Sequence, residues 1–142
     1  ATLVFTEEMR LSGADFDPTL EEALHLVTSQ GYAKAYPQVF GEAPGSSLAK
    51  LMDQARGGHF LRVPRRSPQA AYFTYRDQSC DYACQVTEFS YWAITSLRGQ
   101  QGQKGRARQI ADEWRLASPE LMKQQAPELT RLLSQPVYAL LP

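Results

Sequence analysis

The chain has 142 residues, of which 43% are hydrophobic, and its 15 Lys and Arg residues equal its 15 Asp and Glu residues in number. This length suits one compact domain with a substantial core, so we expect residues 1–142 to form a single domain. The balanced charge disfavours binding to nucleic acid or to an anionic membrane. The sequence has no run of about 18 apolar residues, which excludes a membrane-spanning helix by length.

The N-terminal part is expected to begin with a short strand at Leu3–Phe5 and to continue into a helix. Asp17 is placed to cap that helix, and Pro18 suits its first position. Apolar residues then recur at helical spacing until Gly31, which is the expected end of the helix. The apolar residues at this spacing are Leu20, Ala23, Leu24 and Val27.

The middle of the chain combines one clear helix with weaker strand signals. After an aromatic segment broken by Pro37, either Ser46 or Ser47 can cap a helix that runs to about Ala55, before a Gly-Gly pair. The short apolar segments 60–63 and 70–75 are bounded by Pro and Asp, which predicts a β-hairpin or two separate short strands.

The C-terminal half is predicted to be helical. Residues 84–98 have apolar side chains at helical spacing and should form a well-buried helix that stops at a glycine. Three further helices are expected over 106–116, from the Ser118-Pro119 start, and over 127–133. The expected fold class is therefore α+β and predominantly α-helical, with a small hairpin or short sheet.

Two cysteines give the evidence on cellular location. Cys80 and Cys84 are close enough in sequence to form a local disulfide, although free buried thiols and metal ligation remain alternatives. A disulfide would indicate an oxidising compartment, periplasmic or secreted. The chain also starts at Ala1 without an initiator Met, as either a processed mature protein or a trimmed sequence would.

The most informative motif is Glu-Glu-Ala-Leu-His at residues 21–25. In the metal-peptidase motif H-E-x-x-H, two histidines one helical turn apart bind zinc, and the glutamate between them is the general base. Here Glu21 stands at the first histidine position, Glu22 at the base position and His25 at the second histidine position.

A second candidate ligand lies on the predicted helix 84–98. Glu88 is surrounded there by aromatic and apolar residues, and a carboxylate in a dry core needs a compensating partner. A metal ion is one such partner. In the Glu-type zincins the third ligand is a glutamate on a helix downstream of the motif helix, and Thr87–Ala93 looks like that helix.

Together, segments 19–31 and 86–98 resemble a gluzincin-like metallopeptidase domain, a degenerate member of the zincins. The resemblance implies two core helices that bind one divalent metal through Glu21, His25 and Glu88, with Glu22 as general base. It also implies a hydrolase whose substrate is a peptide or protein. Tyr75, Tyr82 and Tyr91 matter in this context because a phenol near the site can stabilise an oxyanion.

The carboxylate at position 21 changes the expected chemistry. Two carboxylates and one imidazole neutralise a dication, so bound water would be less acidic than beside neutral histidines. Zinc remains the first expectation, while manganese or calcium also suits oxygen ligands. The enzyme would be slow or inactive, and an inactive zincin-like binding module is one alternative.

Other interpretations need no metal at this position. Glu21 and Glu22 could simply favour the positive end of the helix dipole, and His25 could be a core imidazole. Glu88 could pair with an arginine such as Arg62, Arg65 or Arg66. Together these interpretations describe a metal-free helical interaction domain. His59, by contrast, is an alternative metal ligand.

A di-iron carboxylate bundle is a further metal alternative. Glu22 and His25 have its Glu-x-x-His spacing, but the second such pair is missing because residue 56, three before His59, is Arg.

Overall fold

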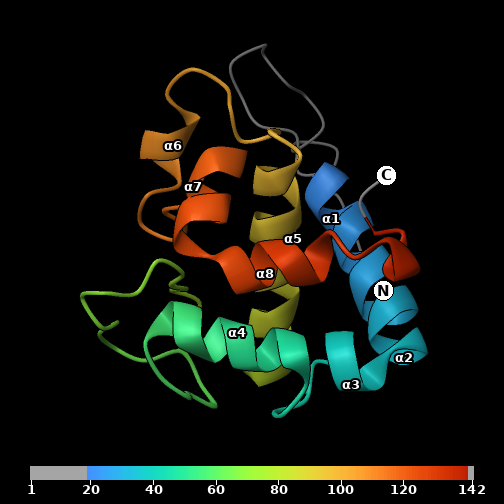
Figure 1. The fold of residues 1–142 in the computed structure, drawn as a ribbon. Helices are drawn as coiled ribbons and strands as arrows, with labels where there is room; N and C mark the ends of the chain where they lie inside the picture. Colours follow the sequence, from blue (N-terminus) through green and yellow to red (C-terminus); the bar gives the residue numbers. More distant parts are fainter. Residues whose placement is uncertain (1–18, 141–142) are drawn as a thin grey trace.

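The computed structural model describes residues 19–140, and this part of the chain is predominantly helical (Figure 1). The predicted strand Leu3–Phe5 and the predicted cap by Asp17 and Pro18 lie outside the described residues. The helices, in chain order, are α1 (Thr19–His25), the π-helix η1 (Leu26–Tyr32), α2 (Ala33–Ala35), α3 (Pro37–Phe40), α4 (Ser47–Arg56), α5 (Tyr82–Leu97), α6 (Arg106–Gln109), α7 (Pro119–Gln125), α8 (Pro127–Leu133) and the 3-10 helix η2 (Pro136–Tyr138).

Helix α5 is the centre of the fold. It runs through the middle of the molecule in Figure 1, and α1, α4, α7 and α8 all pack against it. Asp81 caps its N-terminus by accepting a 2.9 Å hydrogen bond from the Cys84 amide. Most of its side chains are buried, as the predicted helix 84–98 requires. A helix surrounded on all sides can hold a carboxylate away from water.

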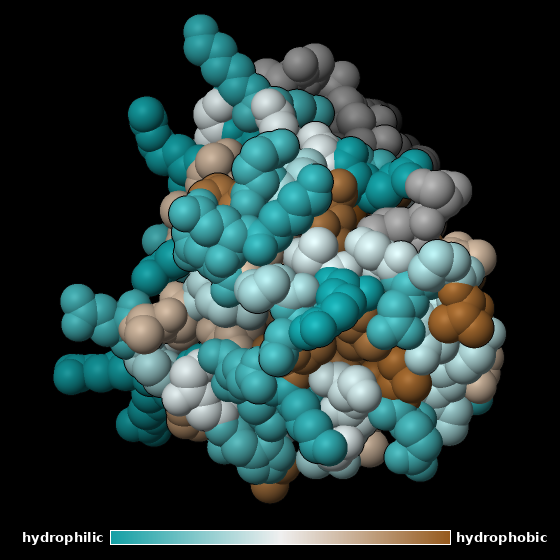
Figure 2. Space-filling view, viewed as in Figure 1, coloured by the Kyte–Doolittle hydropathy of each residue, from teal (hydrophilic) through white to brown (hydrophobic). Residues whose placement is uncertain are grey.

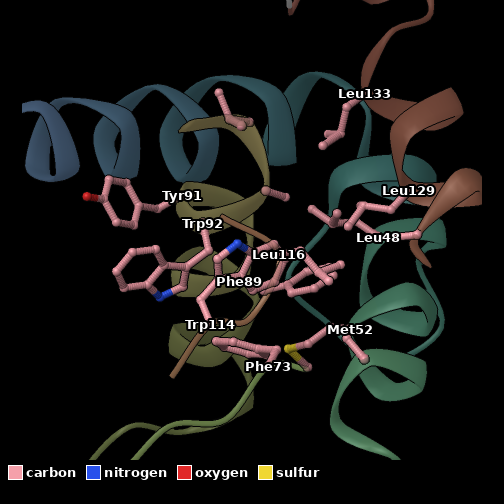
Figure 3. Packing of buried hydrophobic residues seen from close by; sticks show 14 of the residues in the cluster. Leu48, Met52, Phe73, Phe89, Tyr91, Trp92, Trp114, Leu116, Leu129 and Leu133 are labelled. Atoms are coloured by element: carbon pink, nitrogen blue, oxygen red, sulfur yellow. The ribbon is translucent and has the colours of Figure 1, made fainter. Parts of the chain in front are cut away.

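The core beside α5 is rich in aromatic side chains (Figure 3). The ring centroid of Phe89 lies 5.3 Å from that of Phe73 and 6.0 Å from that of Trp114. All three side chains are fully buried. The indole nitrogen of Trp114 donates a 2.8 Å hydrogen bond to the Ser96 hydroxyl, so its polar atom is satisfied.

The first helical segment is longer than predicted, because Gly31 does not end it. The chain continues from α1 through η1 into α2 without leaving helical conformation. Tyr32 fixes this continuation, since its ring packs against Phe40 at 5.6 Å and its hydroxyl donates to the Tyr138 carbonyl at 2.9 Å. Tertiary packing therefore overrides the helix-ending tendency of glycine.

The predicted hairpin of segments 60–63 and 70–75 is wrong. Within residues 19–140 the only β pairings are two isolated bridges, Arg62 with Asp81 and Phe73 with Trp114. The amides of Tyr72 and Phe73 bond to the Ala55 carbonyl at the end of α4 instead of to a neighbouring strand. Val63, Ala71 and Phe73 are buried, whereas Leu61 is exposed. Short apolar segments of this kind can be buried without sheet pairing, and sequence periodicity alone does not distinguish the two cases.

The helix predicted over 106–116 is shorter in the structure, where α6 ends at Gln109. The backbone that follows pairs with residues 72–74, through the Thr74 amide to the Glu113 carbonyl at 2.8 Å and the Arg115 amide to the Tyr72 carbonyl at 3.0 Å. This pairing brings Glu113 close to the candidate site described below.

The start of α4 confirms the predicted serine cap and identifies Ser46 as the capping residue. Its buried hydroxyl accepts from the Ala49 amide at 3.0 Å and donates to the Gly41 carbonyl at 2.6 Å. Gly57 ends the helix with a φ of 73°, a left-handed conformation that favours glycine.

Loss of this cap should measurably destabilise the protein. Ser46→Ala removes both hydrogen bonds and is expected to lower the free energy of unfolding by about 1–2 kcal/mol. Ser47→Ala, one position along and exposed, is the matched control and should change it by less than about 0.5 kcal/mol. Urea unfolding measures both, and equal effects of the two substitutions would contradict the assigned cap.

The two cysteines form a disulfide, Cys80–Cys84, with their Cα atoms 5.4 Å apart. This bond settles the choice among disulfide, free thiols and metal ligation in favour of the disulfide. It is compatible with an extracellular location. Among the helices described, none is long and apolar enough to cross a bilayer. Figure 2 shows that much of the viewed face is hydrophilic, with brown apolar side chains in separate groups.

Candidate metal centre

The packing of α1 against α5 brings Glu21, His25 and Glu88 together. Glu21 and His25 are one turn apart on α1, so their side chains share the helix face that meets α5. One ligand atom from each of the three residues lies within 4.8 Å of the others. The three predicted metal ligands therefore converge, although they come from residues up to 67 positions apart in the sequence.

The imidazole of His25 is placed as a ligand would be. Its Nε2 atom is buried, has no hydrogen-bond partner within residues 19–140, and lies 3.6 Å from Oε2 of Glu88. Two ligands of a tetrahedral zinc ion at bond lengths of about 2.0–2.1 Å are about 3.3 Å apart. The observed separation is too long for a hydrogen bond and close to that of two ligands on one ion.

The two carboxylates are held in an environment that disfavours negative charge. Burial is the main cause that raises the pKa of Glu21 to about 7, followed by the charges of Glu22 and Glu113. Burial, and then the charge of Glu21, raise the pKa of Glu88 to about 8. A bound dication would remove this cost, since it compensates both carboxylates at once.

The protonation of His25 also suits a ligand. Burial lowers the pKa of its imidazole, against the opposing charges of Glu22 and Glu42. The imidazole is therefore neutral near pH 7, which is the form that binds metals.

Two tyrosine hydroxyls lie near the carboxylates. Tyr75 acts to lower the pKa of Glu88, and Tyr91 acts to lower the pKa of Glu21, in each case against the larger effect of burial. In Figure 3 the Tyr91 ring reaches from α5 beneath the blue helix that contains α1. Polar groups in this position can orient metal ligands. Of the three tyrosines considered from the sequence, only Tyr82 lies elsewhere, where its hydroxyl donates to Asp53 at 3.0 Å.

Glu22, the predicted general base, lies beside the imidazole. Its Oε2 atom is 4.0 Å from Nδ1 of His25, whereas Nε2 of the same ring faces Glu88. The side chain of Glu22 is 32% exposed, so it is reachable by water. Its position allows two roles, proton transfer at the edge of the site or orientation of the histidine.

Two charged residues near the site were not predicted from the sequence. Glu113 contributes to the raised pKa values of both Glu21 and Glu88, and burial raises its own pKa. Arg106 acts to lower the pKa of Glu21, and it donates a 2.9 Å hydrogen bond to Gln101. No motif marks either residue: the backbone pairing of segments 72–74 and 113–115 places Glu113, and the start of α6 places Arg106.

Neither His59 nor an arginine takes the place of the three converging residues. His59 lies apart from them and bonds to Asp53 at 2.7 Å. Within residues 19–140 Glu88 forms no ion pair with Arg62, Arg65 or Arg66, and its Oε2 atom lies 3.6 Å from Nε2 of His25. These arginines therefore do not supply the ionic partner that a buried Glu88 requires.

The raised carboxyl pKa values predict how the metal-free protein responds to pH. In the folded state Glu21 and Glu88 hold their protons up to about pH 7 and 8, whereas unfolded glutamate releases them near 4.5. The stability they contribute is therefore complete below pH 4.5 and is lost as pH rises through the folded pKa values. His25 has the opposite slope, but its contribution is complete above about pH 6.5.

We therefore expect the unfolding free energy of the metal-free protein, measured in the presence of a chelator, to fall by roughly 3 kcal/mol between pH 6.5 and 9. Urea unfolding at several pH values measures this slope. The double variant Glu21→Gln/Glu88→Gln should flatten it, and a stability that rises over this range in the wild type would contradict the described environment.

Comparison with known proteins adds no further assignment: no family model, curated protein or solved structure matches the chain. The resemblance to zincins therefore stays a prediction. What the structure supports is a candidate metal-binding group formed by Glu21, His25 and Glu88.

Proposed function

We propose that Glu21, His25 and Glu88 bind one divalent metal ion, with zinc as the first choice. The observation on which this proposal depends most is the buried Nε2 atom of His25, which lacks a hydrogen bond and lies 3.6 Å from Glu88. A buried polar atom without a partner is costly, and a metal ion is the partner that an imidazole and two carboxylates share.

The donor set restricts the identity of the metal. One nitrogen and two carboxylates fit zinc, whose usual protein ligands include all three groups. Carboxylates also suit manganese, whereas a site for calcium would need six or more oxygen ligands. The three residues leave coordination positions open to a substrate or water, as catalytic sites do and structural sites do not.

We further propose that the site hydrolyses peptide bonds. A metal held there would supply Lewis acidity. Glu22 would take a proton from the attacking water as that water forms a bond to the carbonyl carbon. It would then give the proton to the amine nitrogen as the carbon–nitrogen bond breaks. Tyr75 and Tyr91, near the carboxylates of Glu88 and Glu21, would help to orient them.

The disulfide Cys80–Cys84 supports an oxidising location for this activity. We accordingly propose a periplasmic or secreted protein that acts on peptides or proteins outside the cytoplasm.

Substitution of the proposed base tests the hydrolase assignment. At saturating zinc, Glu22→Gln should reduce cleavage of a fluorogenic peptide mixture by about 10²–10⁴-fold, the usual contribution of a general base. Zinc should remain bound, because Glu22 is not among the converging ligands. The matched control is Glu128→Gln, an exposed first-turn glutamate on α8, which should leave cleavage unchanged.

Two results would contradict the hydrolase assignment. Unchanged cleavage in the Glu22→Gln variant would exclude Glu22 as the base. A zinc-saturated wild type that cleaves nothing would instead favour a binding module, since two carboxylate ligands reduce the acidity of bound water.

A further inference from the structure

Arginine side chains from three separate segments surround a hollow of about 330 Å³ on the surface of the molecule. We call the site the arginine hollow and define it by Arg65, Arg76 and Arg115. Asp112 is the only acidic residue in its lining, so the hollow has a surplus of two positive charges. The chain as a whole is neutral, which makes this local surplus specific to the site.

The backbone pairing beside the core determines which side chains face the hollow. Phe73 is fully buried in the core. The three residues that follow it, Thr74, Tyr75 and Arg76, all line the hollow. The bridge between Phe73 and Trp114 fixes this arrangement, and the Arg115 amide bonds to the facing backbone at 3.0 Å.

Much of the donor capacity of the three arginines is not used inside the protein. Arg76 bonds to Asp112 at 2.6 Å, and Arg115 donates one 3.2 Å hydrogen bond to the Gln69 carbonyl. Within residues 19–140, Arg65 forms no recorded hydrogen bond or ion pair. A guanidinium has five N–H donors in a planar fork that matches a carboxylate. The hollow can therefore offer several charge-assisted bonds to one anionic group.

The arginine hollow adjoins the candidate metal centre. Tyr75 lines the hollow and also influences the pKa of the proposed ligand Glu88. Arg76 and Asp112 also line a second hollow of about 330 Å³, which includes Glu113. Phe73, two residues before Tyr75, packs against Phe89, the residue after Glu88, with the ring centroids 5.3 Å apart. The arginine hollow therefore lies beside the part of α5 that holds Glu88.

We propose that the arginine hollow binds a carboxylate of the peptide substrate. This inference rests on the proposed function, because a peptide at the metal centre is the molecule whose end or side chain would reach the hollow. Carboxylates are the oxyanions that an unmodified peptide contains, either at its C-terminus or on Asp and Glu. The arginine hollow would select acidic peptides and position them at the metal centre.

The test compares three fluorescein-labelled probes on the zinc-loaded full chain by fluorescence anisotropy. The probes are hexa-alanine with a free C-terminal carboxylate, the same peptide with a C-terminal amide, and the amide with Glu as its last residue. We expect at least one acidic probe to bind about tenfold more tightly than the neutral amide, the effect of one good charged hydrogen bond. Tighter binding of the probe with a free C-terminus would indicate that the hollow binds a terminal carboxylate. Tighter binding of the amidated probe that ends in Glu would indicate a side-chain carboxylate.

Variants connect that preference to the hollow. Arg65→Ala/Arg115→Ala should remove the preference and leave binding of the neutral amide unchanged. Arg66→Ala is the matched control, because Arg66 is an exposed neighbour of Arg65 outside the lining, and it should keep the preference. Equal binding of all three probes to the wild type would overturn the inference. So would a preference that survives the double variant, or displacement of the acidic probe by inorganic phosphate at a tenfold lower concentration than by acetate.

Failure of this inference can be distinguished from failure of the metal proposal. A zinc titration of the same protein measures the metal site independently of the probes. Stoichiometric zinc with no preference for acidic probes overturns only the arginine hollow. Absence of zinc binding overturns the proposed function, and it also overturns the stated role of the hollow as part of a metal-dependent site.

Discussion

Replacing Glu88 with glutamine is expected to weaken zinc binding by more than about a hundredfold. Loss of a residue that only orients a ligand costs about 10–100-fold, and Glu88 is itself one of the three converging ligands. The neutral amide also fits the buried position better than a carboxylate, because burial already favours the uncharged form of Glu88. The metal-free variant should consequently be more stable than the metal-free wild type above pH 8.

The substitution should weaken zinc binding but stabilise the metal-free protein. A residue with only a structural role would not give both results. Zinc titration by calorimetry measures the affinity, and urea unfolding in chelator measures the stability. Glu42→Gln is the matched control, because Glu42 is half-buried and its charge reaches His25 but it is not one of the converging ligands. Wild-type zinc affinity in the Glu88→Gln variant would show that Glu88 does not bind the metal.

The largest effect on stability is expected from Phe89→Ala. Phe89 is fully buried in α5 between Phe73 and Trp114, and neither aromatic neighbour can move to fill the space without losing its own contacts. Truncation of a buried phenylalanine costs about 3–5 kcal/mol. A domain of this size has about 5–15 kcal/mol of total stability, so the variant should be close to unfolding at 37 °C.

Urea unfolding with a far-ultraviolet circular dichroism readout tests this expectation. The exposed Val137 is the control position, and Val137→Ala should change the unfolding free energy by less than about 0.5 kcal/mol. A loss below about 1 kcal/mol for Phe89→Ala would show that the aromatic cluster is not the main source of stability.

Helices with strong local signals were predicted well. The serine cap at Ser46 and the helix 127–133 agree with the structure, as does the buried helix around Glu88. In each case a capping side chain, a proline or a sustained apolar periodicity specifies the element within a few residues. The local disulfide Cys80–Cys84 belongs with these successes, because its geometry depends on one turn only.

Elements that depend on distant contacts were not predicted. The helix continues past Gly31 because Tyr32 packs against Phe40 and bonds to Tyr138, which is 106 residues away. Segments 60–63 and 70–75 do not pair with each other as a hairpin, because their single bridges are to Asp81 and to Trp114. Hydrophobic pattern indicates burial in these segments but does not reveal the packing partner.

The residues of the candidate site also fall into those that the sequence predicted and those that it did not. Glu21 and His25 were found because their spacing places both on one helix face, and Glu88 because a lone carboxylate in an apolar helix needs a partner. Glu113 and Arg106 were missed, since the predicted helix 106–116 gave no reason to expect a reversal beside segment 72–74. The resemblance to zincins located the ligands, whereas the surroundings of the site came only from the structure.

The proposed site requires that one metal ion binds between α1 and α5. Anomalous diffraction at the zinc absorption edge, from crystals grown with one equivalent of zinc, tests this most directly. We expect a single ion within about 2.0–2.2 Å of Glu21, His25 and Glu88. An ion bound elsewhere, for example at Asp53 and His59, or no ion at all, would contradict it.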